Sequence, residues 1–333
     1  MAGFTPLEHR QYAHCESGVV TALLKGRGLD LSEAMVFGIA GGLAFAFFPF
    51  IKINGMPLVA YRMLPRSIIK GAIKNLAVKF ETRRYGERGK ALVELNELID
   101  RGQTVGLQTS VYWLPYFPPE MRFQFNAHNI IVYGREGDEF LVSDPVFEHP
   151  VRVKTGDLQN ARFARGTLAP KGFLYYPTAV GPSIDLEAAI RKSIKRTARM
   201  MLHTPLPFIG VKGIFLLGRS IERLKAVPDL RQARLFLAHI VRMQEEIGTG
   251  GGGFRFMYAA FLQEAGLLMG SAQLAEASQM MTEAGDMWRQ FALACAKACK
   301  SKTASIDVEK IAQLVRACAR QEKVVYSFLK SIN

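Results

Sequence analysis

Cysteine is scarce in this chain of 333 residues, and its distribution argues against disulfide bonds and against a metal site. Cys295, Cys299 and Cys318 lie near the C-terminal end, whereas Cys15 stands alone near the other end. Cys295 and Cys299 would share a face of a helix, but no histidine or further cysteine nearby completes a ligand set. We therefore expect no metal, and we expect a reducing compartment, because a disulfide framework needs paired cysteines.

A secretory signal and a transmembrane helix are also missing. The stretch MAGFTPLEHRQYAHC carries acid, base and histidine where a signal peptide has an apolar core. An uncharged run over residues 34–51 (AMVFGIAGGLAFAFFPFI) approaches the length of a bilayer span, but three glycines and Pro49 interrupt it. We expect this run to form buried core, and we expect a cytoplasmic protein without a transmembrane segment.

Acidic residues are too few to balance the basic ones. Lys and Arg number 43 against 29 Asp and Glu, which gives a formal net charge of +14. The excess lies in residues 66–90 and 151–230, whose net charges are +6 and +9. A basic surface attracts an acidic partner, such as an acidic acyl carrier protein, and a peripheral contact with an anionic membrane stays open. Zinc-finger spacing, RNA-binding aromatic signatures and basic DNA-reading helices are missing, so we expect no nucleic-acid partner.

Helical and strand-like patterns alternate in the first half of the chain, whereas the second half is almost entirely helical in period. This change predicts an α+β domain over residues 1–180 and a helical domain over residues 183–333. In the first domain we expect helices over 17–25, 31–37 and 91–100 and strands over 104–113, 129–134 and 139–143. In the second we expect helices near 184–201, 229–247, 254–268, 271–300 and 305–331, the first of them capped by Ser183, and a loop at 248–253 (GTGGGG).

One cysteine, one histidine and one aspartate are placed as a nucleophilic triad would be. Cys15 directly precedes an expected helix, and a helix N-terminus and a neighbouring imidazolium both favour the thiolate. His128 enters one expected strand and Asp144 ends the next, so a hairpin would bring them together. This order resembles that of papain-like enzymes, and it predicts Cys15 as nucleophile, His128 as base and Asp144 as the group that orients it. The alternative is a cysteine buried in the core beside a chance hairpin.

Gln11 and His14, both in the segment before Cys15, are candidates for accessory roles. An acyl transfer needs hydrogen-bond donors for the oxyanion, and the backbone amide of Cys15 is the first candidate. Gln11 is a candidate for the second donor, against the alternative of an ordinary surface glutamine. His14 either steers an acceptor amine or caps the helix.

Aromatic and basic residues further along the chain are candidates for a substrate channel. The stretch VYWLPY provides Tyr112, Trp113 and Tyr116, although aromatic runs also fill cores. Arg255 follows the glycine run and is a further candidate. That run lacks the preceding strand and the lysine of a phosphate-binding loop, so we expect no bound ATP.

Several segments resemble the butirosin biosynthesis protein H family. HCESGVVTALL, LSEAMVFGIAGGLAFAF, VYWLPY, HNIIVYG and VSDP resemble its N-terminal domain, and IGTGGGGFRFMYAAFLQEAG is similar to the helical domain that accompanies it. The resemblance implies a papain-like cysteine-peptidase or acyltransferase fold of the α+β class, followed by an all-α domain that completes the substrate site. It also implies acyl or aminoacyl transfer from an acyl carrier protein thioester to a small amine acceptor through acyl-Cys15. The phosphopantetheine belongs to the carrier protein, and no cofactor on the enzyme itself is implied.

The same triad serves a peptidase, a thioesterase or an acyltransferase, because all three form an acyl-enzyme. The two basic segments, the second domain and the missing secretion signal favour transfer. The apolar FAFFPF and the helices rich in Met and Phe hint at a lipid-like substrate, although such residues also fill ordinary cores. A papain-like peptidase, a thioesterase and an inactive module that binds a carrier protein stay as alternatives.

Overall fold

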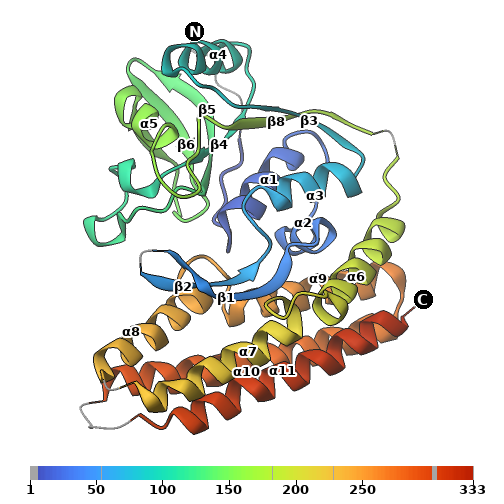
Figure 1. Cartoon of the computed structure of the whole chain (residues 1–333). Helices are drawn as coiled ribbons and strands as arrows, with labels where there is room; N and C mark the ends of the chain where they lie inside the picture. The colour runs from blue at the N-terminus through green and yellow to red at the C-terminus, as the bar shows by residue number, and fades with distance from the viewer. Residues whose placement is uncertain (1–6, 54, 182, 228, 302–305, 333) are drawn as a thin grey trace. The chain divides into compact units, whose positions relative to one another are not determined.

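The computed structural model describes residues 7–53, 55–181, 183–227, 229–301 and 306–332. These residues form two compact units (Figure 1). The sheet unit comprises Met1–Val36 and Pro65–Ile184, and the helical unit comprises Phe37–Leu64 and Asp185–Asn333. The predicted α+β class, followed by a helical part, is confirmed.

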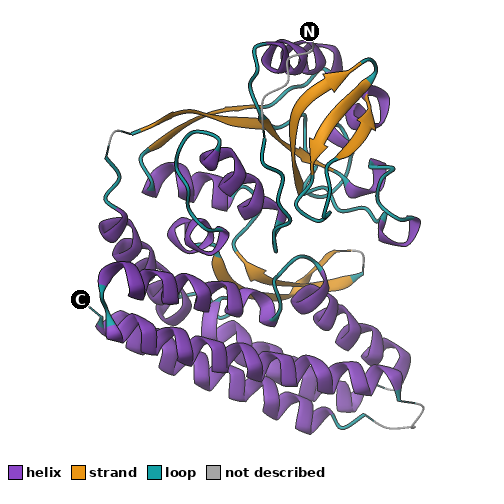
Figure 2. Ribbon diagram, turned by 180° about the vertical axis from the view of Figure 1, so that it is seen from behind, coloured by secondary structure: helices purple, strands orange, loops and turns teal. Residues whose placement is uncertain are grey.

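The sheet unit is built on six strands in the order β3-β8-β4-β5-β6-β7, and every neighbouring pair is antiparallel (Figure 2). The strands are β3 (Val78–Arg83), β4 (Val105–Thr109), β5 (His128–Glu136), β6 (Glu139–Ser143), β7 (Val151–Lys154) and β8 (Leu174–Val180). β4 and the first part of β5 are buried on both faces. These strands therefore bury polar side chains, Gln108, Thr109, His128 and Asn129, together with their apolar ones.

Four helices accompany this sheet: α1 (Cys15–Lys25), α3 (Ser67–Asn75), α4 (Arg88–Asp100) and α5 (Thr155–Arg162). Side chains of α4 and α5 form one hydrophobic core with Val105 and Leu107 of β4. Gly106 between them faces the other way, and a Cβ there would lie 2.7 Å from the Tyr175 ring and 3.1 Å from Leu23 of α1. Because successive strand residues point to opposite faces, α1 covers the face opposite α4 and α5, and Gly106 permits that close approach.

The helical unit contains a β-hairpin and a set of long helices. Its elements are β1 (Leu43–Ile53), β2 (Met56–Arg62), α6 (Leu186–His203), α7 (Gly210–Glu222), α8 (Leu230–Val241), α9 (Arg255–Met269), α10 (Ala272–Lys300) and α11 (Val308–Ser331). The division between the units falls within α2 (Glu33–Ala40). In Figure 1 the long helices α7, α10 and α11 run side by side. No helix among the described residues has the length and apolar character that crossing a membrane requires.

The hairpin is where the structure departs from the predicted domain boundaries. Residues 37–64 belong to the helical unit instead of the first domain, because Ala46 of β1 bridges to Ile209 and the amide of Phe47 donates to Phe208 at 2.8 Å. The apolar run expected to be buried core is buried from residue 34 through Phe45 and again at Phe47, but Phe50 is 63% exposed. Periodicity alone did not reveal this hairpin, because an apolar run of this length fits a buried helix as well as a strand.

Local predictions differ from the structure at element ends and in elements that were not expected, among them α3, α5, β3 and β7. The strand expected over 104–113 ends at Thr109 and continues into a 3-10 turn, Val111–Trp113. α6 is capped by Asp185, whose side chain accepts from the amide of Ala188 at 2.9 Å, and not by Ser183. α7 was not expected, and residue 305, predicted to begin the last helix, lies outside the described residues.

A fully buried ion pair lies in the core of the helical unit. The Arg255 guanidinium donates to both carboxylate oxygens of Glu322, at 2.8 and 3.1 Å, and to the carbonyl of Gly253 at 2.6 Å. The Trp288 indole donates to the same carboxylate at 2.5 Å. Arg255, Glu322 and Trp288 are all 0% exposed. Removing one partner would leave a buried charge without compensation, which costs far more than losing a surface pair.

Glu322→Gln should therefore destabilise the helical unit by about 3 kcal/mol, whereas Glu309→Gln, which breaks an exposed pair with Lys225, should leave the free energy of unfolding nearly unchanged. Urea denaturation followed by the fluorescence of the buried Trp288 measures both changes. Equal stability of the two variants would contradict the role given to the buried pair.

Candidate active site

Cys15 is the first residue of α1 and is 9% exposed. The preceding residue, His14, caps the helix: its ring nitrogen accepts from the backbone amide of Ser17 at 3.3 Å. The Glu33 carboxylate accepts from the His14 amide at 2.9 Å and from the Ser17 hydroxyl at 2.7 Å. These contacts fix the N-terminal turn that carries the cysteine. Of the two roles predicted for His14, the structure places it in the capping one.

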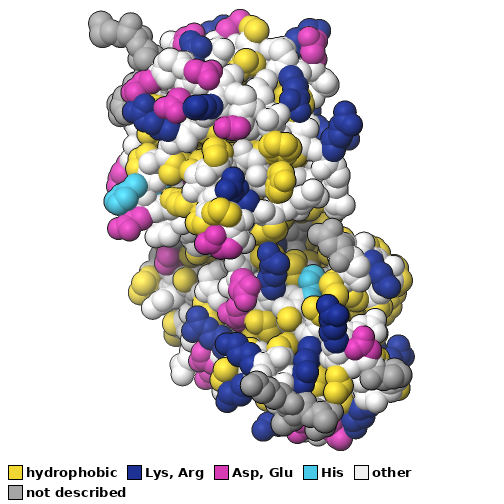
Figure 3. All heavy atoms as spheres, turned by 90° about the vertical axis from the view of Figure 1, so that its left-hand side faces the viewer, with side chains coloured by type: hydrophobic (Ala, Val, Ile, Leu, Met, Phe, Trp, Pro, Cys, Tyr) yellow, Lys and Arg dark blue, Asp and Glu magenta, His cyan; other side chains and the backbone are white. Residues whose placement is uncertain are grey.

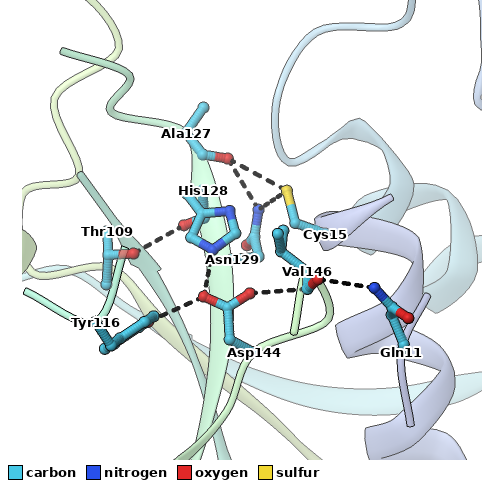
Figure 4. A network of polar contacts seen from close by, with 9 residues as sticks. All are labelled: Gln11, Cys15, Thr109, Tyr116, Ala127, His128, Asn129, Asp144 and Val146. Carbon is cyan, nitrogen blue, oxygen red and sulfur yellow. Dashed lines mark hydrogen bonds and ion pairs between the residues drawn. The ribbon is translucent and has the colours of Figure 1, made fainter. Parts of the chain in front are cut away.

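His128 and Asp144 meet at the end of the sheet. β5 begins at His128, and Asp144 directly follows β6. Ile131 pairs with Ser143, so His128 and Asp144 face the same side as diagonal neighbours. The Nε2 atom of His128 lies 2.7 Å from Oδ2 of Asp144 (Figure 4). A carboxylate only accepts, so Nε2 carries a proton and the other ring nitrogen is left for chemistry.

Asp144 is fully buried and has two further donors. The Tyr116 hydroxyl donates to Oδ2 at 2.9 Å, and the backbone amide of Val146 donates to Oδ1 at 3.0 Å. Burial and then the charge of Asp144 raise the pKa of Tyr116 well above its usual 10, so the phenol keeps its proton and donates. Tyr116 is therefore a partner of Asp144, which corrects its assignment to a substrate channel.

The electrostatics of His128 favour its charged form. Burial acts to lower the pKa of His128, but the Asp144 carboxylate outweighs burial by its charge and its hydrogen bond, and a hydrogen bond with Cys15 adds to this. Together they raise the pKa of His128 to about 10. At neutral pH the ring is then an imidazolium beside the cysteine, the arrangement that favours a thiolate.

The Cys15 sulfur also contacts two groups that sequence reasoning did not assign. Sγ lies 4.0 Å from the carbonyl oxygen of Ala127 and 3.9 Å from Nδ2 of Asn129 (Figure 4). The Tyr175 hydroxyl donates to Oδ1 of Asn129 at 2.9 Å. In the sequence, Asn129 is recognisable only as the residue that follows His128. That position does not show whether its side chain faces the cysteine.

Gln11 does not face the cysteine. Its amide nitrogen donates to the carbonyl of Val146 at 2.9 Å, in the loop that carries Asp144 (Figure 4). Two residues earlier, the His9 ring contacts the hydroxyl of Ser143 at 2.7 Å. Gln11 therefore ties the segment before Cys15 to the loop after β6, and in this position its amide is not an oxyanion donor.

Tyr112 and Trp113 line a pocket of about 380 Å³ in the sheet unit. They are 46% and 42% exposed, and Arg88, Arg165 and Asn126 are among the other lining residues. None of the described residues that line it is acidic. A pocket of this size accommodates a small polar molecule, and Asn126 lies two residues before His128 in the sequence.

Arg255, the remaining channel candidate, is instead committed to the core of the helical unit. Its guanidinium is buried, pairs with Glu322 and lies close to the rings of Tyr61 and Trp288, 5.7 and 5.2 Å from their centroids. A glycine run followed by arginine does not reveal this, because the partner Glu322 lies far along the chain. Within the described part of the chain, no cluster of three or more His, Cys, Asp or Glu could hold a metal ion.

Basic side chains are distributed unevenly. On the face shown in Figure 3, Lys and Arg are interspersed with Asp and Glu. α6 presents a denser series of exposed bases at helical spacing: Arg191, Lys192, Lys195, Arg196 and Arg199. Such a helix face is suited to an acidic protein surface.

Comparison with known proteins gives two family matches. Residues 14–145 match the family described as butirosin biosynthesis protein H, N-terminal. Residues 156–329, just over half of the chain, match the family described as domain of unknown function DUF4872. A search of curated proteins finds no match.

Among solved structures, the chain is similar to a protein described as a C39-like peptidase from Bacillus anthracis. The two sequences are 14% identical, the alignment covers 54% of this chain and 100% of the other, and the TM-score is 0.38.

Iodoacetamide should label Cys15 before the other three cysteines at neutral pH, because labelling requires a thiolate. Burial raises the pKa of Cys295 and of Cys318 well above the usual 9, and also raises that of Cys299. Peptide mass spectrometry over time measures the order. His128→Ala should slow the labelling of Cys15, whereas His239→Ala, at a histidine on α8, should not. Faster modification of Cys299 in the folded protein would show that the nucleophile is misassigned.

The pH dependence of stability should report the His128–Asp144 pair. The pKa of His128 rises from 6.5 to about 10 on folding, so its contribution is fully present below about pH 6.5 and is lost as pH rises through 10. We expect wild type to lose its advantage in unfolding free energy over His128→Ala between about pH 6 and pH 10. Urea denaturation across that range measures it, and a difference independent of pH would contradict the raised pKa.

Proposed function

The chain belongs to the family described as domain of unknown function DUF4872, and its residues 14–145 match the butirosin biosynthesis protein H N-terminal family; from this second match we propose that it is a cysteine-dependent N-acyltransferase. It takes an acyl or aminoacyl group from the phosphopantetheine thioester of an acidic acyl carrier protein and transfers it to a small amine. The observation that carries the proposal is the arrangement of Cys15 at the start of α1 beside a His128 ring whose charge Asp144 stabilises.

The first half-reaction forms an acyl-enzyme. The Cys15 thiolate attacks the thioester carbonyl, and the bond between that carbon and the pantetheine sulfur breaks. His128 gives its proton to the departing thiolate, which leaves as a thiol, and the neutral ring remains hydrogen-bonded to Asp144. Asp144 keeps the ring oriented, because its second oxygen is held by the Val146 amide.

The second half-reaction forms the amide. The amine nitrogen attacks the acyl-Cys15 carbonyl while the neutral His128 ring accepts its proton. The tetrahedral intermediate then expels the Cys15 thiolate, and the imidazolium and thiolate of the starting state are restored. Each cycle moves one acyl group and one proton, so no redox cofactor or metal is required by the balance.

Further features of the two units support this reaction. In the sheet unit, the pocket lined by Tyr112, Trp113 and Arg165 offers aromatic, amide and cationic contacts to a small polar part of a substrate. In the helical unit, the exposed bases of α6 suit an acidic carrier protein. All four cysteines are free, which agrees with the reducing cytoplasm that we propose as its location.

Mixing the protein with an acylated carrier protein in the absence of amine should leave the acyl group on Cys15. Intact-mass analysis should show the added mass in wild type and in Cys299→Ala, and not in Cys15→Ala. Adding the correct amine should release the group as an amide. Because thioester attack proceeds through the thiolate, Cys15→Ala should lower the rate at least about a thousandfold.

Two other results would redirect the assignment. Acylation by peptides but by no carrier-bound thioester would favour a peptidase, and rapid discharge to water in the presence of candidate amines would favour a thioesterase. Binding of the carrier protein without any acylation would indicate a binding module.

A further inference from the structure

Two adjacent residues of β5 approach the Cys15 sulfur from different faces of the sheet. The side chain of His128 lies on the same face of the sheet as those of Ile130 and Val132, which belong to the core formed with α4 and α5. Its ring packs against the ring of Phe117, with 5.5 Å between the centroids. Asn129 points to the opposite face, where α1 lies and where Tyr175 contacts it. The Asn129 amide therefore lies between the sheet and the helix that carries the nucleophile, and it is 2% exposed.

The chemistry of the neighbours fixes which end of the Asn129 amide faces the sulfur. One amide atom lies 3.1 Å from the carbonyl oxygen of Ala127, and a carbonyl only accepts, so that atom is the nitrogen Nδ2. Burial raises the pKa of Tyr175 well above its usual 10, so its hydroxyl keeps the proton that it donates to Oδ1. Of the two Nδ2 hydrogens, one serves Ala127 and the other is left for Sγ, 3.9 Å away.

We propose that Asn129 is a catalytic residue that donates a hydrogen bond to the ionised sulfur of Cys15, and that Tyr175 is the positioning residue that holds the amide in place. The geometry gives the amide a second effect. The carbonyl oxygen of Ala127 lies 4.0 Å from the sulfur, and its partial negative charge would repel a thiolate there. The Asn129 amide donates a hydrogen bond to this oxygen and so weakens the repulsion. The sulfur thus has a charged donor, His128, and a neutral donor, Asn129.

The alternative role, an oxyanion donor, fits the burial less well. An oxyanion forms on the substrate side of the sulfur, whereas Asn129 lies among β5, β8 and α1, with Tyr175 0% exposed beside it. Gly106 supports this placement, because a Cβ there would displace the Tyr175 ring. The proposal rests on the proposed function in one respect only, that Cys15 is the nucleophile.

Two reactions of Cys15 separate the roles. Alkylation by iodoacetamide requires the thiolate but forms no oxyanion. Acylation by a small thioester requires the thiolate and also passes through an oxyanion. Asn129→Ala should slow both reactions at neutral pH by the same factor, about 10- to 100-fold, the range for a hydrogen bond to a charged group. Tyr175→Phe keeps the ring and the amide but frees Oδ1, and it should slow both by about 2- to 10-fold. Tyr258→Phe, at a buried tyrosine of the helical unit, is the matched control and should change neither.

The pH profile distinguishes thiolate stabilisation from a loss of local structure. The labelling deficit of Asn129→Ala should shrink as pH rises, because high pH ionises the thiol without help. A deficit constant with pH, unchanged labelling, or a loss confined to acylation would each overturn the proposal, and the last would assign Asn129 to the oxyanion. If Asn129→Ala does not fold, Tyr175→Phe still decides. Labelling tests the proposal even if no thioester acylates the wild-type enzyme, so its failure and that of the proposed function are distinguishable.

Discussion

The contact between His128 and Asp144 is the interaction on which the candidate site depends. A buried carboxylate is costly unless charge and hydrogen bonds replace the water it has lost. Here the Tyr116 hydroxyl and the Val146 amide supply two hydrogen bonds, and His128 supplies the compensating charge. The same balance that makes the burial of Asp144 tolerable keeps His128 protonated, so the stability of the site and the positive charge beside Cys15 have one physical origin.

The candidate site as a whole requires distant parts of the chain to come together. His128 and Asp144 come from one hairpin, but Cys15 comes from the first helix, and Gln11 and His9 join the segment before it to the loop after β6. Loops are mobile unless their backbone groups are held. The side chains of His9 and Gln11 hold the loop here, so the N-terminal segment sets the position of Cys15 relative to the Asp144 carboxylate.

The sequence allowed the elements around the triad to be predicted, because their signals are local. A helix after Cys15 and a hairpin between His128 and Asp144 follow from periodicity and turn residues within short windows. Tyr116, Tyr175 and the partner of Arg255 could not be assigned in this way, since each role depends on a contact with a residue far along the chain. The assignment of the β1–β2 hairpin to the helical unit could not be predicted for a related reason, because it depends on contacts with residues 208 and 209.

The strand geometry explains how one short segment serves the sulfur twice. Side chains alternate along a strand, so the side chains of His128 and Asn129 lie on opposite faces of β5. Both can reach the sulfur of Cys15, at the start of α1, because they lie at the end of the strand. A shift of β5 by one residue would exchange the two faces and separate the imidazole from Asp144 and the amide from Tyr175 together. The pairing of Thr109 with His128, which fixes the register of β5 against β4, is therefore as much a requirement of the site as the side chains that touch the sulfur.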